Sequence, residues 1–142
     1  MNIKNKTCIN GILAMAILLA VGLGCSEISK ISGIGEYGTK LEFNGGELYY
    51  TNNVTEAEAR RLGNYLVKEG LFDGNRKTVQ LDKAGSTYQF RVVVLKEKQN
   101  DPATFQIWKE AAAEISRDVF NNAPTEVHVC DDHLKTLRVI TP

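Results

Sequence analysis

The feature that most constrains this chain is an uncharged apolar run near its amino terminus. Residues Gly11 to Gly24 carry no charged side chain, and Lys4 and Lys6 precede them without any acidic residue. As a helix this run would be about 21 Å long at ~1.5 Å per residue, which is short of the ~30 Å hydrocarbon core of a bilayer. A basic flank followed by a short apolar run is typical of a secretory signal peptide. The pattern therefore predicts that residues 1–24 are an export signal and not part of the fold.

The apolar run ends at a cysteine between two small residues, Gly24-Cys25-Ser26. This stretch resembles the lipobox of bacterial lipoproteins, although Gly22 stands where most lipoboxes have an aliphatic residue. The resemblance implies that diacylglycerol is attached to the thiol of Cys25, that a signal peptidase cuts in front of it, and that the new amine is acylated. Two or more acyl chains hold a protein to a membrane where one chain is marginal. Because Ser26 is not an aspartate, the resemblance implies export to the outer membrane in a Gram-negative cell.

Two other interpretations of the amino terminus stay open, namely a cleaved secretory signal without a lipid and an uncleaved anchor. A buried helix of a globular fold fits poorly, because a helix without a polar face needs burial on all sides. Residues 25–38 are small, polar and rich in glycine, which predicts a flexible tether. They contain a formal GxGxxG from Gly33 to Gly38. A dinucleotide fingerprint must follow a strand and open a helix, and here a polar linker precedes it, so we reject a cofactor site.

Residues 39–142 have the patterns of one folded domain with strands paired by short turns. Asn44-Gly45 lies between alternating apolar residues and predicts a hairpin over residues 39–51, since both positions tolerate positive φ. Alternation predicts a second hairpin over residues 79–94 and a third over residues 126–141.

Two amphipathic helices are expected between these hairpins. Thr55 and Glu58 have the spacing of a capping box, and Asp101-Pro102 has the residues of a helix start. The first helix carries its apolar stripe on Ala59, Leu62, Gly63 and Leu66, and the second carries it on Phe105, Trp108, Ala112, Ile115 and Val119. A glycine within the first stripe indicates close packing of that helix, at Gly63, against a strand.

The expected order of elements is ββαββαββ. Strands joined by short turns are antiparallel, and both amphipathic helices need an apolar face to cover. We therefore expect an α+β two-layer sandwich, with an antiparallel sheet of about six strands and two helices on one face. Its inner βαββαβ part is similar to the ferredoxin-like motif.

One cluster of side chains could carry chemistry, at His128, Cys130, Asp131, Asp132 and His133. On a strand, His128 and Cys130 project to the same side, about 6.5 Å apart along it, and imidazole and thiolate groups both suit zinc. The candidate metal ligands are therefore His128, Cys130 and His133. The structural alternative is that Val127 and Val129 face the core while Cys130 is a small buried filler, and a Cys–His nucleophile or redox thiol is a third reading.

The weaker candidates are side chains whose surroundings the sequence does not show. Six aromatic residues could line a ligand groove, although we expect four or more to fill the core: Tyr49, Tyr50, Tyr65, Tyr88, Phe90 and Trp108. Glu110 and Glu114 are spaced as a carboxylate pair, and a solvated helix surface is the expected alternative.

Charge and composition limit the function further. The formal net charge is +0, which provides no basic field for nucleic acid. We expect a bacterial lipoprotein held to an envelope membrane through Cys25, facing the periplasm or the exterior. Its domain is expected to be a non-enzymatic binding module for an envelope protein or a small ligand, using a sheet face or an edge strand. The alternative is a metal- or thiol-dependent activity at His128, Cys130 and His133, with zinc as the possible metal.

Overall fold

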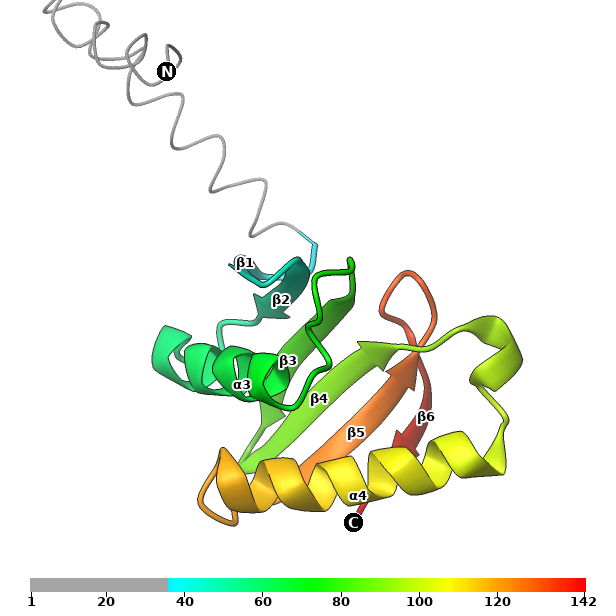
Figure 1. Cartoon of the computed structure of the whole chain (residues 1–142). Helices are drawn as coiled ribbons and strands as arrows, with labels where there is room; N and C mark the ends of the chain where they lie inside the picture. Colours follow the sequence, from blue (N-terminus) through cyan, green and yellow to red (C-terminus); the bar gives the residue numbers. More distant parts are fainter. Residues whose placement is uncertain (1–35) are drawn as a thin grey trace, which may run out of the picture. The chain divides into compact units, whose positions relative to one another are not determined.

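The computed structural model describes residues 36–142. The expected signal peptide, the expected lipidation site Cys25 and most of the expected tether therefore lie outside the described residues. The elements follow one another along the chain as in Figure 1: β1 (Thr39–Phe43), β2 (Gly46–Tyr50), α3 (Glu56–Lys68), β3 (Thr78–Ala84), β4 (Thr87–Val93), the 3₁₀ helix η1 (Lys96–Lys98), α4 (Pro102–Asp118), β5 (Thr125–Cys130) and β6 (Thr136–Ile140).

The six strands form one sheet, in the order β1-β2-β3-β4-β5-β6. The prediction of an α+β fold with a six-stranded sheet and two helices is confirmed. The prediction of an antiparallel sheet is wrong, because β2 pairs with β3 in parallel and β4 pairs with β5 in parallel. Each of these pairs is joined through a helix, α3 or α4, which returns the chain to the end where the first strand began. The sheet is therefore mixed.

The resemblance to the ferredoxin-like motif is also not matched. A ferredoxin-like sheet splits each βαβ unit, so that another strand lies between the two strands that the helix joins. Here both helix-joined pairs are direct neighbours in the sheet. Within the sheet, the two βαβ units meet at the antiparallel pair β3–β4. The sheet thus consists of two halves, β1–β3 and β4–β6, which are joined along the antiparallel pair β3–β4. This pair is the central seam of the sheet.

The first hairpin forms as its turn residues predict. Asn44 and Gly45 have φ of 42° and 83°, and Phe43 pairs with Gly46 across the turn. Positive φ at both central positions matches the right-handed twist of the flanking strands. The expected capping box also forms, with Glu58 N donating to Thr55 Oγ1 over 3.2 Å. At the second helix, the carboxylate of Asp101 accepts a hydrogen bond from the N–H of Ala103.

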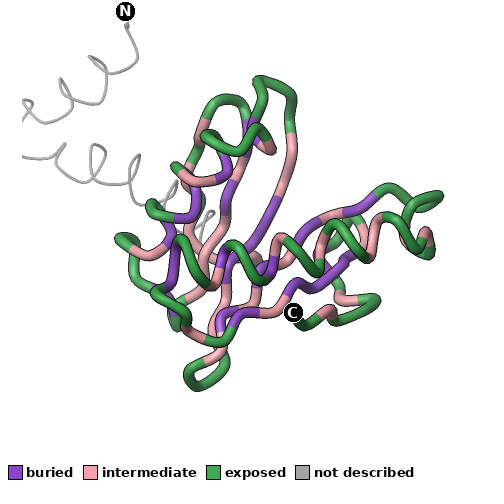
Figure 2. Tube along the Cα trace, turned by 60° about the horizontal axis from the view of Figure 1, so that its bottom comes forward, coloured by how far each residue is buried: buried purple, intermediate pink, exposed green. Residues whose placement is uncertain are grey.

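Both helices cover the same face of the sheet, as Figure 1 shows. The register places apolar residues of four strands side by side on that face, in one row of Leu48, Val79, Val92 and Val129 and a second row of Tyr50, Leu81, Phe90 and Val127. Figure 2 shows the resulting buried stretches along the central strands. The expected inward orientation of Val127 and Val129 is confirmed, since neither is exposed.

The close approach expected at Gly63 is present. A Cβ atom at Gly63 would lie 2.2 Å from the ring of Phe43 in β1, so a larger residue there would displace that ring. The two helices also contact each other, because Tyr65 Oη of α3 donates to Glu114 Oε2 of α4 over 3.4 Å.

The folded unit begins slightly earlier than the sequence indicates. It runs from Tyr37 to Pro142, and the backbone carbonyl of Tyr37 accepts a hydrogen bond of 2.8 Å from Gln80 Nε2. The Tyr37 ring meets the ring of Tyr49 edge-on, with their centroids 5.7 Å apart. The last two residues of the expected tether are therefore part of the domain. Neither helix within residues 36–142 is long and apolar enough to cross a membrane.

Candidate functional site

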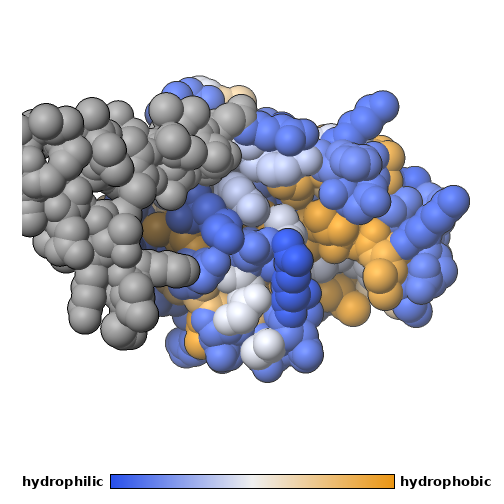
Figure 3. Space-filling model, turned by 90° about the horizontal axis from the view of Figure 1, so that it is seen from above, coloured by the Kyte–Doolittle hydropathy of each residue, from blue (hydrophilic) through white to orange (hydrophobic). Residues whose placement is uncertain are grey.

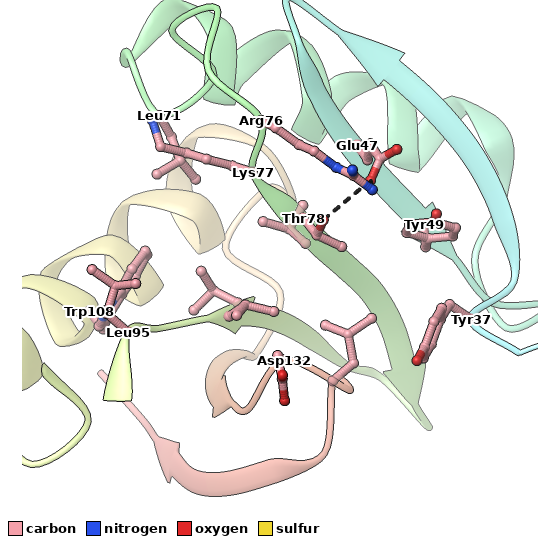
Figure 4. Close-up of a pocket in the computed structure, with 14 residues that line it drawn as sticks. Tyr37, Glu47, Tyr49, Leu71, Arg76, Lys77, Thr78, Leu95, Trp108 and Asp132 are labelled. Atoms are coloured by element: carbon pink, nitrogen blue, oxygen red, sulfur yellow. Dashed lines mark hydrogen bonds and ion pairs between the residues drawn. The ribbon is translucent and has the colours of Figure 1, made fainter. Parts of the chain in front are cut away.

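A cleft of about 650 Å³ opens at one end of the sheet, where β3 begins and β4 ends. Figure 4 shows the side chains that surround it. They come from the three strands β2, β3 and β4, helix α4, several loops and the segment in front of β1: Tyr37, Glu47, Tyr49, Leu71, Arg76, Lys77, Thr78, Val79, Val92, Val93, Leu95, Trp108, Asp132 and Leu134.

The cleft exists because the central seam of the sheet opens at this end. The antiparallel pairing of β3 with β4 stops at Val79 and Val92. One residue further, Thr78 still pairs with Glu47 of β2, and Val93 still pairs with Cys130 of β5. Beyond this point β3 stays paired with its parallel partner β2, and β4 stays paired with its parallel partner β5, while β3 and β4 separate from each other. The cleft lies between the two βαβ halves, in a place that the topology dictates.

The walls of the cleft are mainly apolar. Val79 and Val92 are core residues that form part of it, and Leu95 is 68% exposed beside them. Trp108 of α4 packs against Phe90, with ring centroids 6.1 Å apart. Seen from above in Figure 3, a patch of apolar side chains is surrounded by polar ones at the end of the molecule where the cleft opens. An aromatic and aliphatic lining of this kind suits an apolar ligand.

The rim carries an organised group of charges around Glu47. Its carboxylate accepts hydrogen bonds from Lys40 Nζ at 3.2 Å, from Arg76 Nη2 at 3.3 Å and from Thr78 Oγ1 at 3.3 Å. Burial alone raises the pKa of Glu47, but the two cations outweigh it and the pKa lies below its ordinary value. Glu47 is therefore ionised and holds the guanidinium of Arg76 at the rim, where the Arg76 side chain is 81% exposed.

Two more charged side chains border the cleft. Lys77 Nζ forms an ion pair of 2.7 Å with Asp73. Asp132 comes from the β5–β6 loop, where its carboxylate is exposed and lies 3.7 Å from His133 Nε2. Figure 4 shows Asp132 on the other side of the cleft from Arg76. The cleft therefore has Arg76, paired with Glu47, at one side of its rim and the carboxylate of Asp132 at the other.

His128 lies on the sheet face opposite the helices, within a polar network. Its Nδ1 lies 3.0 Å from Thr136 Oγ1 and its Nε2 lies 2.9 Å from Glu126 Oε1. Arg91 reaches the same hydroxyl through Nη1 at 3.3 Å, and its buried Nε has no hydrogen-bond partner among the described residues. Both ring nitrogens of His128 are thus engaged with side chains of the sheet itself.

The three candidate metal ligands do not converge. Cys130 is buried, as the structural alternative expects, and its Sγ lies 3.4 Å from the carbonyl oxygen of His128. Burial raises the pKa of this thiol above its ordinary value, which opposes the thiolate that a nucleophile or a metal ligand needs. His133 lies in the loop between β5 and β6, with 79% of its side chain exposed. Within residues 36–142 no group of three His, Cys, Asp or Glu side chains could hold a metal ion.

The aromatic candidates divide between the core and the cleft. Tyr49 and Trp108 line the cleft, whereas Tyr88 and Phe90 are core residues and Tyr50 and Tyr65 pack against the core. The other expected surface pair, Glu110 and Glu114, is not a site, because Glu110 binds Gln106 and Glu114 binds Tyr65.

Most of the remaining cleft residues carry no signal in the sequence. Arg76 and Lys77 come from the segment before β3, Leu95 follows β4, and Asp132 and Leu134 come from the β5–β6 loop. Asp132 belongs to the cluster around His128 and His133 that the sequence singles out, and the other four positions belong to no motif. Only the opening of the seam between β3 and β4 brings them together.

In a comparison with known families, residues 40–141 match the AF_1994_N family N-terminal domain. This match spans almost the whole folded unit and includes every cleft residue except Tyr37. No curated protein and no solved structure matches the chain.

Proposed function

The chain belongs to the AF_1994_N family, and for this member we propose the role of a lipid-anchored envelope protein whose domain binds an apolar ligand in the cleft between β3 and β4. The observation that carries the binding function is the cleft itself. Its volume of about 650 Å³ falls within the range of about 300–1,000 Å³ that is usual for ligand sites.

Binding is favoured over catalysis by the chemistry of the lining. The described residues that line the cleft include no histidine, cysteine or serine. Nucleophilic catalysis needs a nucleophile beside a general base. His128 and Cys130 do not line the cleft, and each is held in its own hydrogen bonds. A mainly apolar wall with a few fixed charges is the usual composition of a binding site.

The proposed anchor places this site near a membrane. Lipidation at Cys25 would attach the chain to the bilayer, with the domain in the periplasm or at the exterior and with the outer membrane as the expected location in a Gram-negative cell. Tyr37 is both the first residue of the folded unit and part of the cleft wall. The segment from Cys25 to Tyr37 can extend to at most about 40 Å at ~3.5 Å per residue. The cleft would therefore stay within a short distance of the lipid surface.

The binding function can be tested with the full chain in phosphatidylcholine bilayer discs and a neutral apolar dye, N-phenyl-1-naphthylamine. The chain has one tryptophan, Trp108, which lines the cleft, so the saturable part of the energy transfer from it, above the transfer to dye dissolved in the bilayer, reports a dye bound there. We expect saturable transfer that Leu95→Glu reduces. Ile107→Glu is the matched control, because Ile107 is exposed on α4 to a similar degree, 61%, and does not line the cleft. Equal transfer in both variants would refute binding in the cleft.

The anchor is tested separately by metabolic labelling. Cells that express the full chain should incorporate labelled palmitate into it, and Cys25→Ala should give an uncleaved precursor without label. Equal labelling of the variant and the parent chain would remove the anchor from the proposal without affecting the binding test.

A further inference from the structure

We infer that the ligand of the cleft is a single-chain anionic lipid, with its acyl chain along the apolar wall and its headgroup on Arg76. This inference rests on the proposed binding function and names the class of ligand. It is drawn from the position of one cation, from the form of the apolar wall and from the point at which the chain enters the domain.

Arg76 has guanidinium N–H groups that can bind an anion. Glu47 contacts its guanidinium only through Nη2, at 3.3 Å, and the other guanidinium nitrogens have no partner among the described residues. A guanidinium presents five N–H donors in a planar fork, and such a fork binds carboxylate and phosphate groups through two parallel hydrogen bonds. The planar fork of an arginine is pre-organised, so less conformational freedom is lost for each hydrogen bond that forms when an anion binds.

The apolar wall beside Arg76 suits one hydrocarbon chain. It is built from aliphatic side chains of both halves of the sheet and of the loops: Leu71, Val79, Val92, Val93, Leu95 and Leu134. Each methylene group of a lipid contributes about 0.8 kcal/mol when it leaves water. The cleft has the volume of a site for one small molecule, which favours a lipid with one chain over a lipid with two.

The other rim residues determine in which orientation the lipid binds. Asp132 lies across the cleft from Arg76 (Figure 4), and its exposed carboxylate would repel an anionic headgroup placed on that side. The rings of Tyr37, Tyr49 and Trp108 border the cleft, and amphipathic aromatic rings of this kind are preferred at boundaries between lipid and water. Glu47 also places a carboxylate beside Arg76, but two cations, Lys40 and Arg76, contact that carboxylate. The headgroup is therefore directed to Arg76 and the chain away from it.

Membrane lipid is the favoured source of this ligand because of the route of the chain. The folded unit begins at Tyr37 in the cleft wall, so an anchor at Cys25 would keep the mouth of the cleft within about 40 Å of the bilayer at ~3.5 Å per residue. A tether of that length gives lipids of the membrane a high effective concentration at the cleft.

Contact quenching by brominated lipids tests this inference. The full chain in phosphatidylcholine bilayer discs is titrated at alkaline pH with dibromostearate, which is anionic, and with dibromostearoyl glycerol, which is its uncharged counterpart. Bromine quenches indole fluorescence on contact, and Trp108 is the single tryptophan. We expect saturable quenching by both lipids, with the anionic lipid bound about tenfold more tightly because its headgroup gains charge-assisted hydrogen bonds.

Two exposed positions and their controls decide the outcome. Arg76→Ala should remove the tenfold preference, and Arg60→Ala, which removes an exposed cation of α3 outside the cleft, should keep it. Leu95→Glu should weaken the binding of both lipids, whereas Ile107→Glu should not. Equal affinity for the two lipids, or a preference that persists in Arg76→Ala, would overturn the inference that the ligand is anionic. It would not affect the proposed apolar binding site. An absence of saturable quenching by either lipid overturns both the inference and the binding function, while palmitate labelling still reports on the anchor.

Discussion

The carboxylate of Glu58 is expected to make the stability of the domain depend on acid pH. Tyr88 Oη donates a hydrogen bond to Glu58 Oε1, and Thr55 donates to Oε2 through its backbone N at 2.7 Å and its Oγ1 at 2.8 Å. Lys83 Nζ lies 3.5 Å from Oε1. Burial by itself raises the pKa of Glu58, but these donors and the charge of Lys83 lower it to about 2.

The size and the sign of the effect follow from this pKa. The ordinary value is 4.5, and a shift of one pKa unit corresponds to ~1.36 kcal/mol, so the ionised carboxylate stabilises the folded state by on the order of 3 kcal/mol. Because the folded-state pKa is the lower one, this stabilisation is complete above the unfolded-state value of about 4.5 and is lost as the pH falls toward about 2. Glu58→Gln removes it at every pH while keeping the shape of the side chain.

Urea unfolding of the domain Tyr37–Pro142, followed by circular dichroism at several pH values, measures the difference directly. We expect Glu58→Gln to be less stable than the parent by on the order of 3 kcal/mol near neutral pH, with the two free energies of unfolding converging toward pH ~2. Tyr88→Phe should show a smaller effect of the same form, since it removes one of the donors. A stability difference for Glu58→Gln that is the same at neutral and at acid pH would refute the argument.

Three further substitutions or treatments test other parts of the structure. Gly63→Ala should lower the melting temperature, because the added Cβ would lie 2.2 Å from the ring of Phe43. Overpacking of this kind costs about 1–3 kcal/mol, whereas the gain in helix propensity is about 1 kcal/mol. A higher melting temperature would contradict the close contact. The thiol of Cys130 is buried and should react with a disulfide reagent only after unfolding in urea, so equal rates in the folded and the unfolded state would show that it is accessible. Thr136→Val should lower the free energy of unfolding by about 1–3 kcal/mol, because it removes the hydroxyl that His128 and Arg91 share. A change below about 0.5 kcal/mol would mean that this network adds no stability.

Local patterns in the sequence predict the elements of the fold well. The Asn44-Gly45 turn, the capping box of Thr55 and Glu58 and the Asp101 cap each depend on residues a few positions apart. Such interactions are decided within one turn or one helix end, so the sequence displays them directly. Strand directions were predicted less well, because a helix between two strands leaves open which strand the second one joins.

The candidate site, like the fold, could be predicted from the sequence only in part. The sequence draws attention to His128, Cys130 and His133 because they are chemically distinctive and close together in the chain. In the structure, the first two are held in a sheet face and the third is exposed in a loop. The cleft depends instead on residues with no distinctive pattern, such as Arg76 and Leu95, which become neighbours only in space.

The sequence by itself determined which segments form strands and helices, where they begin, and that the domain belongs to the α+β class, because these properties follow from local periodicity and from turn and cap residues. Only the tertiary structure decided that the sheet is mixed and that its central seam opens beyond Val79 and Val92. The physical reason is that β3 and β4 each keep the hydrogen bonds to their parallel partners where they lose those to each other. That competition between neighbouring strands is a property of the assembled sheet, and it creates the cleft.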